Sequence, residues 1–570
     1  MFESEGVILN ELLRDRGLIS EAQITEIQEE HDRTGKPLSQ IIVDFGLLTE
    51  DQLLEALALH LGMEFHQLES EELAPAVLRA MPSSAARMYG AVPISATANS
   101  ITVAVLDPYN PHLAEELAFV LGKDVHLALA PRKQIESMVA RYYSEESGSL
   151  KDVLQDMESQ LAKSDLVDAI EKGGTTGTAA LEDLANQAPI VRFVNLILFQ
   201  AIQDRASDIH FEPFEDEFKI RYRVDGALYE MAPPPKHLAI PVISRIKVMS
   251  NLNIAERRVP QDGRIQLPVA GRQVDLRVST LPTQFWESVV LRVLDRTVVN
   301  LELESLGMPA EILERLKELI RTPNGIVIVT GPTGSGKTTT LYSCLKRINT
   351  IDLKLLTAED PVEYDLEGIM QVPVNEAIGM TFARALRSFL RQDPDVIMVG
   401  EMRDLETAQI SIQAALTGHL VFTTLHTNDA PGAITRMIDM GVEPFLISST
   451  LEAVLAQRLI RTICKRCRVA YEPTDAVLGE IGLGRADVQD RPFYYGKGCP
   501  NCNEIGYKGR KGLFELMIIS EPILELINLR APAGVIRAKA LELGMRTLRE
   551  DGVRCILNGE TTVEEVLKYT

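Results

Sequence analysis

The sequence GPTGSGKTTT occupies residues 331–340 and directly follows the apolar run Ile326–Val329. It has the form GxxxxGK[ST], in which glycines let backbone N–H groups converge on phosphate oxygens, the lysine adds a positive charge and the hydroxyl binds Mg²⁺. A strand before the loop and a helix over residues 339–348 are expected. The sequence therefore predicts a phosphate-binding loop made of Gly331, Pro332, Thr333, Gly334, Ser335, Gly336, Lys337, Thr338 and Thr339.

The length and composition are those of a globular protein of several domains. The chain has 570 residues, of which 45% are hydrophobic and 24% are charged, which leaves room for three or four domains. No apolar stretch reaches the roughly 18 to 20 residues that span a bilayer, and charges stand where a signal peptide has its apolar core. We expect a cytoplasmic protein that docks on a membrane protein.

The net charge of −23 raises the electrostatic cost of approaching nucleic acid or anionic lipid. It disfavours a DNA motor. Four of the six cysteines form two CxxC pairs, a pattern that indicates a metal site in a cytoplasmic chain rather than disulfides.

The first 62 residues contain a repeat. Residues 16–23 recur as residues 45–52, and in both copies a Ser or Thr is followed three residues later by Gln. This is a capping box, in which the hydroxyl and the amide each satisfy a free N–H group of the first helical turn. The apolar spacing of the following residues predicts an amphipathic helix. We therefore expect two stacked helical units.

Composition divides the rest of the chain. Residues 63–143 mix short β-like and helical runs and predict a small α+β unit, which completes an N-terminal domain over 1–143. Residues 144–187 become charged and then small and polar, which is typical of a linker. Residues 188–300 predict an α+β domain. From Leu301 to residue 570, strands alternate with helices around the phosphate loop, so we expect an α/β domain with a parallel sheet covered by helices on both faces.

Two acidic stretches follow the loop. The segment LKLLTAEDPVEYD (353–365) places Glu359 and Glu363 after an apolar strand, at the edge of the sheet where ligands bind in open α/β folds. Carboxylates there can activate a water molecule. The segment DPDVIMVGEMRD (393–404) is a strand ending in Glu401, placed to hold Mg²⁺ through water. Taken alone, each is also explained by a solvated acidic turn or strand end.

A third stretch, TGHLVFTTLHTNDA (417–430), carries His419 and His426 around another apolar strand. An imidazole there could contact the γ-phosphate of a nucleotide. A histidine in the core or on the surface is the alternative for either position.

Together, in this order, these motifs resemble the Walker A, Asp box, Walker B and His box of the secretion ATPases that power type II secretion and type IV pilus assembly. The resemblance covers about residues 186–570. It implies a RecA-like ATPase domain, ATP and Mg²⁺ as ligands, and a homohexamer that converts hydrolysis into motion between subunits. It also implies roles: Glu363 activates water with Glu359 in support, Thr338 and Glu401 serve Mg²⁺, and His426 contacts the γ-phosphate.

The domain before the ATPase domain carries further matches to this family, and the resemblance implies a PAS-like α+β fold for it. The matching stretches are ASDIHFEP (206–213), RYRVDG (221–226) and RRVPQDGR (257–264). Arg277 and Arg292 fall where the family has arginines that reach a nucleotide of the same or a neighbouring subunit, and Arg223 is a weaker candidate. For each, a solvated strand position is the alternative. Trp286 stands where the family usually has Gly, so we expect a different loop before Arg292.

Two CxxC turns, 31 residues apart, place Cys464, Cys467, Cys499 and Cys502 as four thiolate ligands. Four sulfurs around one Zn²⁺ leave no water position, so the site is predicted to be structural. A disulfide is the alternative. The insertion, over about residues 461–512, is rich in basic residues, so nucleic-acid binding stays open. In the resembling family this insertion faces partner proteins.

The N-terminal repeat resembles a domain that binds cyclic di-GMP in some related ATPases through an RLG triplet and a terminal Gln in each copy. Here the triplet positions read Ile-Leu-Asn (8–10) and Pro-Leu-Ser (37–39), and the terminal positions read His31 and His60. The polar groups that would hold a guanine nucleotide are replaced. We therefore expect a docking module for an inner-membrane protein and no binding of cyclic di-GMP.

The sequence thus predicts a cytoplasmic, hexameric ATPase that drives pilin or pseudopilin assembly through an inner-membrane platform protein. Type II secretion and pilus assembly share these motifs and are not distinguished. A pilus-retraction ATPase is disfavoured because such enzymes generally lack the N-terminal domain and the tetracysteine insertion. A nucleic-acid translocase and a regulatory nucleotide-binding protein without turnover are the remaining alternatives.

Overall fold

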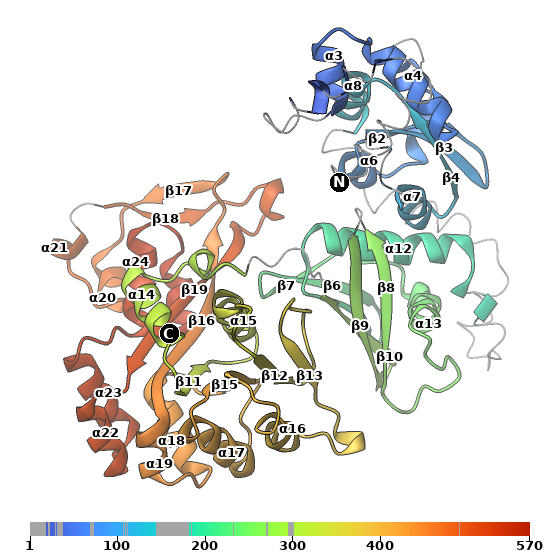
Figure 1. Cartoon of the computed structure of the whole chain (residues 1–570). Helices are drawn as coiled ribbons and strands as arrows, with labels where there is room; N and C mark the ends of the chain where they lie inside the picture. Colours follow the sequence, from blue (N-terminus) through green and yellow to red (C-terminus); the bar gives the residue numbers. More distant parts are fainter. Residues whose placement is uncertain are drawn as a thin grey trace. The chain divides into compact units, whose positions relative to one another are not determined.

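The computed structural model forms two compact units, residues 1–297 and 298–570, which are described separately (Figure 1). The structure describes residues 19–20, 23–24, 26–28, 30, 38–68, 73–106, 108, 110, 112–143, 182–183, 185–231, 233–269, 272–294, 301–488 and 491–570.

The first unit begins with the helices of the predicted repeat. In the second copy, Thr49 forms a complete capping box with Gln52 at the start of its helix, as predicted. In the first copy, the backbone N–H of Ser20 donates to Gln23 Oε1 at 3.0 Å, and most of its other residues lie outside the described ones. The helices are α3 (Leu38–Asp44) and α4 (Glu50–Leu61).

A four-stranded sheet follows, with the order β1-β4-β3-β2. The helices and strands predicted for residues 63–143 are present, and the apolar run at 101–106 forms β3. Their bounds are β1 (Glu64–Phe65), α5 (Pro75–Arg79), α6 (Ser83–Tyr89), β2 (Ala91–Ala96), β3 (Ser100–Val105), α7 (Leu113–Leu121), β4 (Asp124–Leu129) and α8 (Arg132–Tyr142).

The rest of the first unit is a six-stranded antiparallel sheet with the order β7-β6-β5-β10-β9-β8. Two apolar helices, α12 (Ala188–Gln203) and α13 (Ala239–Met249), bury most of their residues. The strands are β5 (Asp208–Pro213), β6 (Phe218–Val224), β7 (Ala227–Glu230), β8 (Gln261–Val269), β9 (Arg272–Thr283) and β10 (Trp286–Leu294).

The second unit contains a seven-stranded sheet with the order β13-β12-β14-β15-β11-β16-β19. Six strands are parallel, as predicted, and the edge strand β19 pairs antiparallel with β16, which was not predicted. The strands are β11 (Gly325–Thr330), β12 (Leu355–Glu359), β13 (Met370–Pro373), β14 (Val396–Val399), β15 (Leu420–Leu425), β16 (Leu451–Ile463) and β19 (Tyr507–Ile518).

Helices cover both faces of this sheet, as the apolar runs require. Along β11, Ile326 and Ile328 belong to one buried cluster, whereas Val327 and Val329 belong to the other. Such alternation follows from the two-residue period of a strand. One face packs against α14 (Ala310–Leu319) and α15 (Lys337–Ile348); the other packs against α16 (Phe382–Phe389), α17 (Leu405–Leu416), α18 (Ala430–Asp439), α22 (Glu521–Asn528) and α23 (Ala533–Glu542).

The predicted insertion lies between the last two strands, β16 and β19. It contains a two-stranded antiparallel sheet and two short helices. Its elements are β17 (Arg468–Tyr471), α20 (Asp475–Glu480), α21 (Arg485–Val488) and β18 (Phe493–Gly496), and the remaining helices of the unit are α19 (Pro444–Thr450), α24 (Leu548–Leu557) and α25 (Val563–Tyr569). Among the described residues, no helix has the length and apolar character to cross a membrane.

Candidate active site

The phosphate loop lies between β11 and α15, at the edge of the sheet where the parallel strands end. Its three glycines, Gly331, Gly334 and Gly336, have φ angles of 150°, 78° and 89°, a region that favours glycine. At Gly331 a Cβ atom would lie 2.4 Å from the carbonyl oxygen of Gln457. The hydroxyl of Ser335 is buried and has no hydrogen-bond partner among the described residues. A tight loop with an unsatisfied buried hydroxyl suits a phosphate ligand.

Lys337 lies over this loop. Its ammonium group donates hydrogen bonds to the carbonyl oxygens of Gly331 at 2.9 Å and Pro332 at 3.0 Å. Burial lowers the pKa of Lys337 to about 8, although the negative charge of Glu401 acts in the opposite direction. The lysine therefore holds its proton less firmly than an exposed lysine does.

Glu401 and His426 meet beside the loop, because β14 and β15 are neighbouring parallel strands that end at the same edge. His426 Nε2 lies 3.2 Å from Glu401 Oε2, and Arg403 pairs with the other carboxylate oxygen of Glu401. The hydroxyl of Thr424 donates to the Gly400 carbonyl at 2.6 Å and ties the two strand ends together. The Glu401 carboxylate and the exposed Thr338 hydroxyl are oxygen ligands of the kind that Mg²⁺ takes.

The two glutamates of the predicted Asp box have different surroundings. Glu359 is only 3% exposed, and its carboxylate accepts hydrogen bonds from Tyr342, from Thr357 at 2.5 Å and from Gln371 at 3.0 Å. Glu363 follows in the turn after β12 and is half-buried. Glu359 is thus buried among protein donors, and Glu363 is the more exposed of the two.

His419 lies at the opposite edge of the sheet. It precedes β15, its carbonyl accepts the N–H of Gly325 at the start of β11, and its Nδ1 lies 2.9 Å from the Ala414 carbonyl. The six residues of β15 separate it from His426, a distance of about 23 Å along a strand. The structure does not bring His419 to the phosphate loop.

Arg277 and Arg292 lie on the six-stranded sheet of the first unit. They are direct cross-strand partners in a row that runs Arg264, Arg277, Arg292, Asp208 and Arg223 across five strands. Directly opposite residues point to the same face of a sheet. Arg292 Nε donates to Asp208 Oδ1 at 3.1 Å, and the Arg223 Nε lies 3.6 Å from Oδ2. The Arg292 side chain is 61% exposed, so this face carries an accessible positive charge.

Trp286 adopts a backbone conformation that favours glycine. Its φ angle is 126°, which L side chains rarely adopt. The ring lies 4.4 Å from the Arg257 guanidinium carbon, and the strand register that pairs Arg292 with Arg277 extends to the pair of Trp286 with Thr283. Strand β10 is therefore paired with β9 over its whole length, from Trp286 to Leu294.

The four cysteines of the two CxxC turns form one cluster, in which all four sulfur atoms lie within 4.8 Å of one another. Cys464 and Cys499 are 3.8 Å apart, as are Cys467 and Cys502. A zinc tetrahedron with metal–sulfur bonds of about 2.3 Å has edges of about 3.8 Å, whereas a disulfide needs about 2.05 Å. The donors and their spacing fit Zn²⁺.

Two buried polar side chains near the loop were not predicted. Gln457, on β16, donates to the Ser335 carbonyl and accepts from the Thr340 hydroxyl, both at 2.7 Å. Arg458 donates to Asn428 at 3.0 Å. Both interrupt the apolar run of residues 453–460, and that interruption is the signal by which the sequence could have revealed them.

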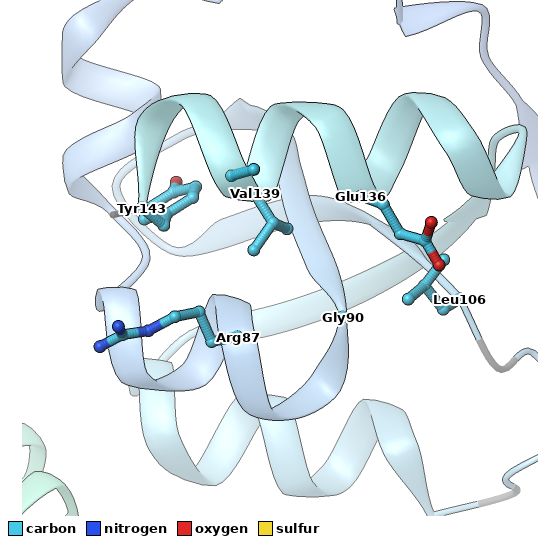
Figure 2. A pocket seen from close by; sticks show the side chains of 7 residues that line it. Arg87, Gly90, Leu106, Glu136, Val139 and Tyr143 are labelled. Atoms are coloured by element: carbon cyan, nitrogen blue, oxygen red, sulfur yellow. The ribbon is translucent and has the colours of Figure 1, made fainter. Parts of the chain in front are cut away.

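The first unit also contains a cavity of about 570 Å³ in its N-terminal part (Figure 2). It is lined by Arg87, Gly90, Leu106, Glu136, Val139, Ala140 and Tyr143. Of the positions that correspond to the cyclic di-GMP triplets and terminal residues, residues 8–10, 31 and 37 lie outside the described residues.

Comparison with known proteins identifies the family. Residues 183–568 match the family described as type II/IV secretion system protein. The chain belongs to this family. This secretion-system protein also matches the MshEN domain over residues 61–149, and it is an ATPase with a RecA-like fold.

Relatives of the secretion ATPase come from two systems. This chain is 42% identical over 564 residues to the type IV pilus assembly ATPase PilB of Myxococcus xanthus, and the match covers 99% of this chain and 98% of that protein. It is 51% identical over 437 residues to the type II secretion system protein HxcR of Pseudomonas aeruginosa, covering 77% of this chain and 88% of that protein. The solved structure of the Legionella pneumophila ATPase DotB matches 66% of this chain and 94% of its own, with a TM-score of 0.50 and 22% identity. That likeness concerns the fold alone.

Proposed function

We propose that this ATPase hydrolyses ATP with Mg²⁺ to power the assembly of pilins or pseudopilins in type II secretion or in a type IV pilus. The observation that carries the proposal is the meeting of Glu401 and His426, 3.2 Å apart, at the sheet edge that carries the phosphate loop. Relatives named for both systems support the two biological settings equally.

Within this site the loop residues 331–339 hold the phosphates, and Lys337 supplies a positive charge toward the β- and γ-phosphates. Thr338 binds Mg²⁺ directly and Glu401 orients its water shell. The ion, when bound, neutralises charge that develops on the phosphate oxygens. His426, held against Glu401, contacts the γ-phosphate. His419 has no part in the proposed site, because its imidazole lies at the far edge of the sheet.

Glu363 is the proposed base. It takes a proton from the water that attacks the γ-phosphorus, and the products are ADP and inorganic phosphate. Glu359 keeps its neighbouring turn in place through its buried hydrogen bonds. A half-buried carboxylate can approach a water molecule, whereas one with three protein donors is already occupied.

Arg277 and Arg292 complete the site in a homohexamer. A guanidinium is always charged and matches the planar, negatively charged γ-phosphoryl group. The exposed side chain of Arg292 and its cross-strand partner Arg277 support a contact with nucleotide on the same or a neighbouring subunit. We place the hexamer in the cytoplasm, attached to the inner membrane through platform and docking proteins.

The cysteine cluster holds one structural Zn²⁺. Four thiolates close the coordination sphere, so the metal stabilises the insertion and takes no part in hydrolysis.

An ATPase assay tests the proposal. The wild-type chain should hydrolyse ATP, Lys337→Ala should lose nucleotide binding and activity, and Glu363→Gln should bind ATP with hydrolysis reduced at least about 100-fold. Equal turnover in the wild type and Lys337→Ala would remove the enzymatic assignment. The same assay with added DNA distinguishes a translocase, since only a translocase is expected to be stimulated.

A further inference from the structure

Tyr342 lies on α15, the helix that starts at Lys337, and its side chain is fully buried. Its hydroxyl donates to Glu359 Oε2. The Tyr342 hydroxyl oxygen also lies 3.3 Å from the backbone nitrogen of Glu363 and accepts its N–H. One hydroxyl thus connects the phosphate-loop helix to both glutamates of the Asp box.

Gln371, on β13, holds the same turn from the other side. Its amide nitrogen donates to the carbonyl of Tyr364 and to Glu359 Oε1, both at 3.0 Å, and lies 3.3 Å from the Tyr342 hydroxyl. Its amide oxygen accepts the N–H of Leu366 at 2.7 Å. The turn between β12 and β13 is therefore held at three backbone positions, residues 363, 364 and 366.

These contacts agree with the hydrogen-bonding capacity of the Tyr342 hydroxyl. A tyrosine hydroxyl has one proton to donate and two lone pairs that accept, and here it donates to Glu359 and accepts from Glu363, with Gln371 Nε2 3.3 Å away. Burial, followed by the hydrogen bond to Glu359, raises the pKa of Tyr342. The hydroxyl therefore keeps its proton at neutral pH. The ring is fixed as well, since it packs edge to face against Tyr364 with centroids 5.7 Å apart.

We propose that Tyr342 is a positioning residue that fixes Glu363 relative to the phosphate loop. Lys337 and Tyr342 share one rigid helix, so the hydroxyl transmits the position of the bound phosphates to the turn that carries the base. Gln371 helps to fix the same turn through its hydrogen bonds to Tyr364 and Leu366. The inference rests on the proposed role of Glu363, and it assigns Tyr342 no contact with substrate.

The test is Tyr342→Phe in the full-length chain, which removes one oxygen and retains the ring. We expect kcat for ATP hydrolysis to fall about 10- to 100-fold, the effect of a small displacement of a catalytic group. The affinity for a fluorescent ATP analogue should stay within about twofold, because the phosphate loop is untouched. Gln371→Leu should give the same separation of kcat from affinity and provides a second variant if Tyr342→Phe does not fold.

The matched control is Tyr143→Phe. Its hydroxyl also donates to a partly buried backbone carbonyl, that of Leu78 at 2.9 Å, but it lies in the N-terminal part of the chain. This variant also loses the hydroxyl of a buried tyrosine and should keep its kcat. A fall in kcat in both tyrosine variants would mean that the effect is not specific to Tyr342.

The outcomes separate the inference from the proposed function. If Glu363→Gln abolishes hydrolysis while Tyr342→Phe and Gln371→Leu keep the wild-type kcat, the positioning role is wrong and the base assignment stands. If Glu363→Gln retains wild-type hydrolysis, the base assignment itself is wrong. A parallel loss of kcat and nucleotide affinity in Tyr342→Phe would also overturn the inference, because Tyr342 would then support the loop as a whole.

Discussion

Lys337 has a pKa of about 8 because its ammonium group is buried, and this makes nucleotide binding sensitive to pH. A phosphate binds the charged lysine, yet about nine-tenths of the nucleotide-free molecules hold a neutral lysine at pH 9. We predict that the dissociation constant for ATP rises about tenfold between pH 7 and pH 9. Titration of the wild-type chain with a fluorescent ATP analogue at each pH measures it.

The control is Lys337→Arg, whose guanidinium stays charged over this range. This variant should bind ATP more weakly but with an affinity that is nearly independent of pH. If its dissociation constant rises with pH as steeply as that of the wild type, the assignment to Lys337 is wrong.

The effect of pH on the stability of the nucleotide-free chain has the opposite sign. The pKa of Lys337 is lowered on folding, so the unfolded chain binds the extra proton between pH 8 and the ordinary value of 10.5. The nucleotide-free chain therefore gains stability as the pH rises through that window.

For single residues, the sequence predicted site residues that directly follow a strand, but it did not predict buried polar residues within a strand. Glu401 and His426 each follow an apolar strand, and the structure brings their side chains together. His419 precedes a strand, so its distance from His426 in sequence becomes the full length of β15 in space. Gln457 acts through a tertiary contact with Ser335, 122 positions away. No local pattern encodes such a pairing.

Strands β16 and β19 are held together at one end by the cysteine cluster. Cys464 directly follows β16, and Cys502 accepts the N–H of Gly506, just before β19. We predict about one zinc ion per chain and a loss of several degrees in the melting temperature after chelation or in Cys464→Ser, because the binding free energy of a structural metal contributes directly to folding. Elemental analysis and thermal unfolding measure the two quantities.

A matched variant is Cys555→Ser, which removes a buried thiol outside the cluster. It should retain the metal whatever it does to stability. A zinc content that is unchanged in a variant with both Cys464 and Cys499 replaced would place the metal elsewhere. Hydrogen exchange should increase in residues 464–506 of the chelated chain and remain low in β11.

Local sequence patterns predicted many of the helices and strands, and β19 is an exception. The strand before the phosphate loop, the helix after it and the apolar helix near residue 190 all appear where their periodicity predicted them. β19 did not stand out, because Gly509 and Gly512 and several basic residues interrupt its first half. Its pairing with β16 is antiparallel, a choice that depends on the path of the intervening insertion.

For the whole molecule, the sequence predicted the kinds of domain but not the order of strands within them. The six parallel strands run β13-β12-β14-β15-β11-β16 in space, so the chain crosses from β11 past two strands to reach β12. That order depends on packing between distant residues. The row of four arginines and Asp208 arises in the same way, since five separate strands must pair in register before these residues become neighbours.

This row leads to a prediction about the assembly. If the arginines of one subunit complete the nucleotide site of another, Arg292→Ala and Lys337→Ala should each be inactive alone but regain activity when co-expressed. Some sites in a mixed ring then combine an intact phosphate loop with an intact arginine. Removing Arg292 leaves Asp208 paired with Arg223 at 3.6 Å, so the sheet should survive the substitution.

The test is to measure ATP hydrolysis by the purified mixed assembly and its mass under native conditions. Random mixing of equal amounts gives about a quarter of sites with both groups intact, so the expected turnover per subunit is about a quarter of the wild-type value, provided that sites act independently. No recovery in assemblies shown to contain both variants would mean that each arginine serves the nucleotide bound to its own chain. The proposed contribution of these arginines to the site of a neighbouring subunit would then be wrong.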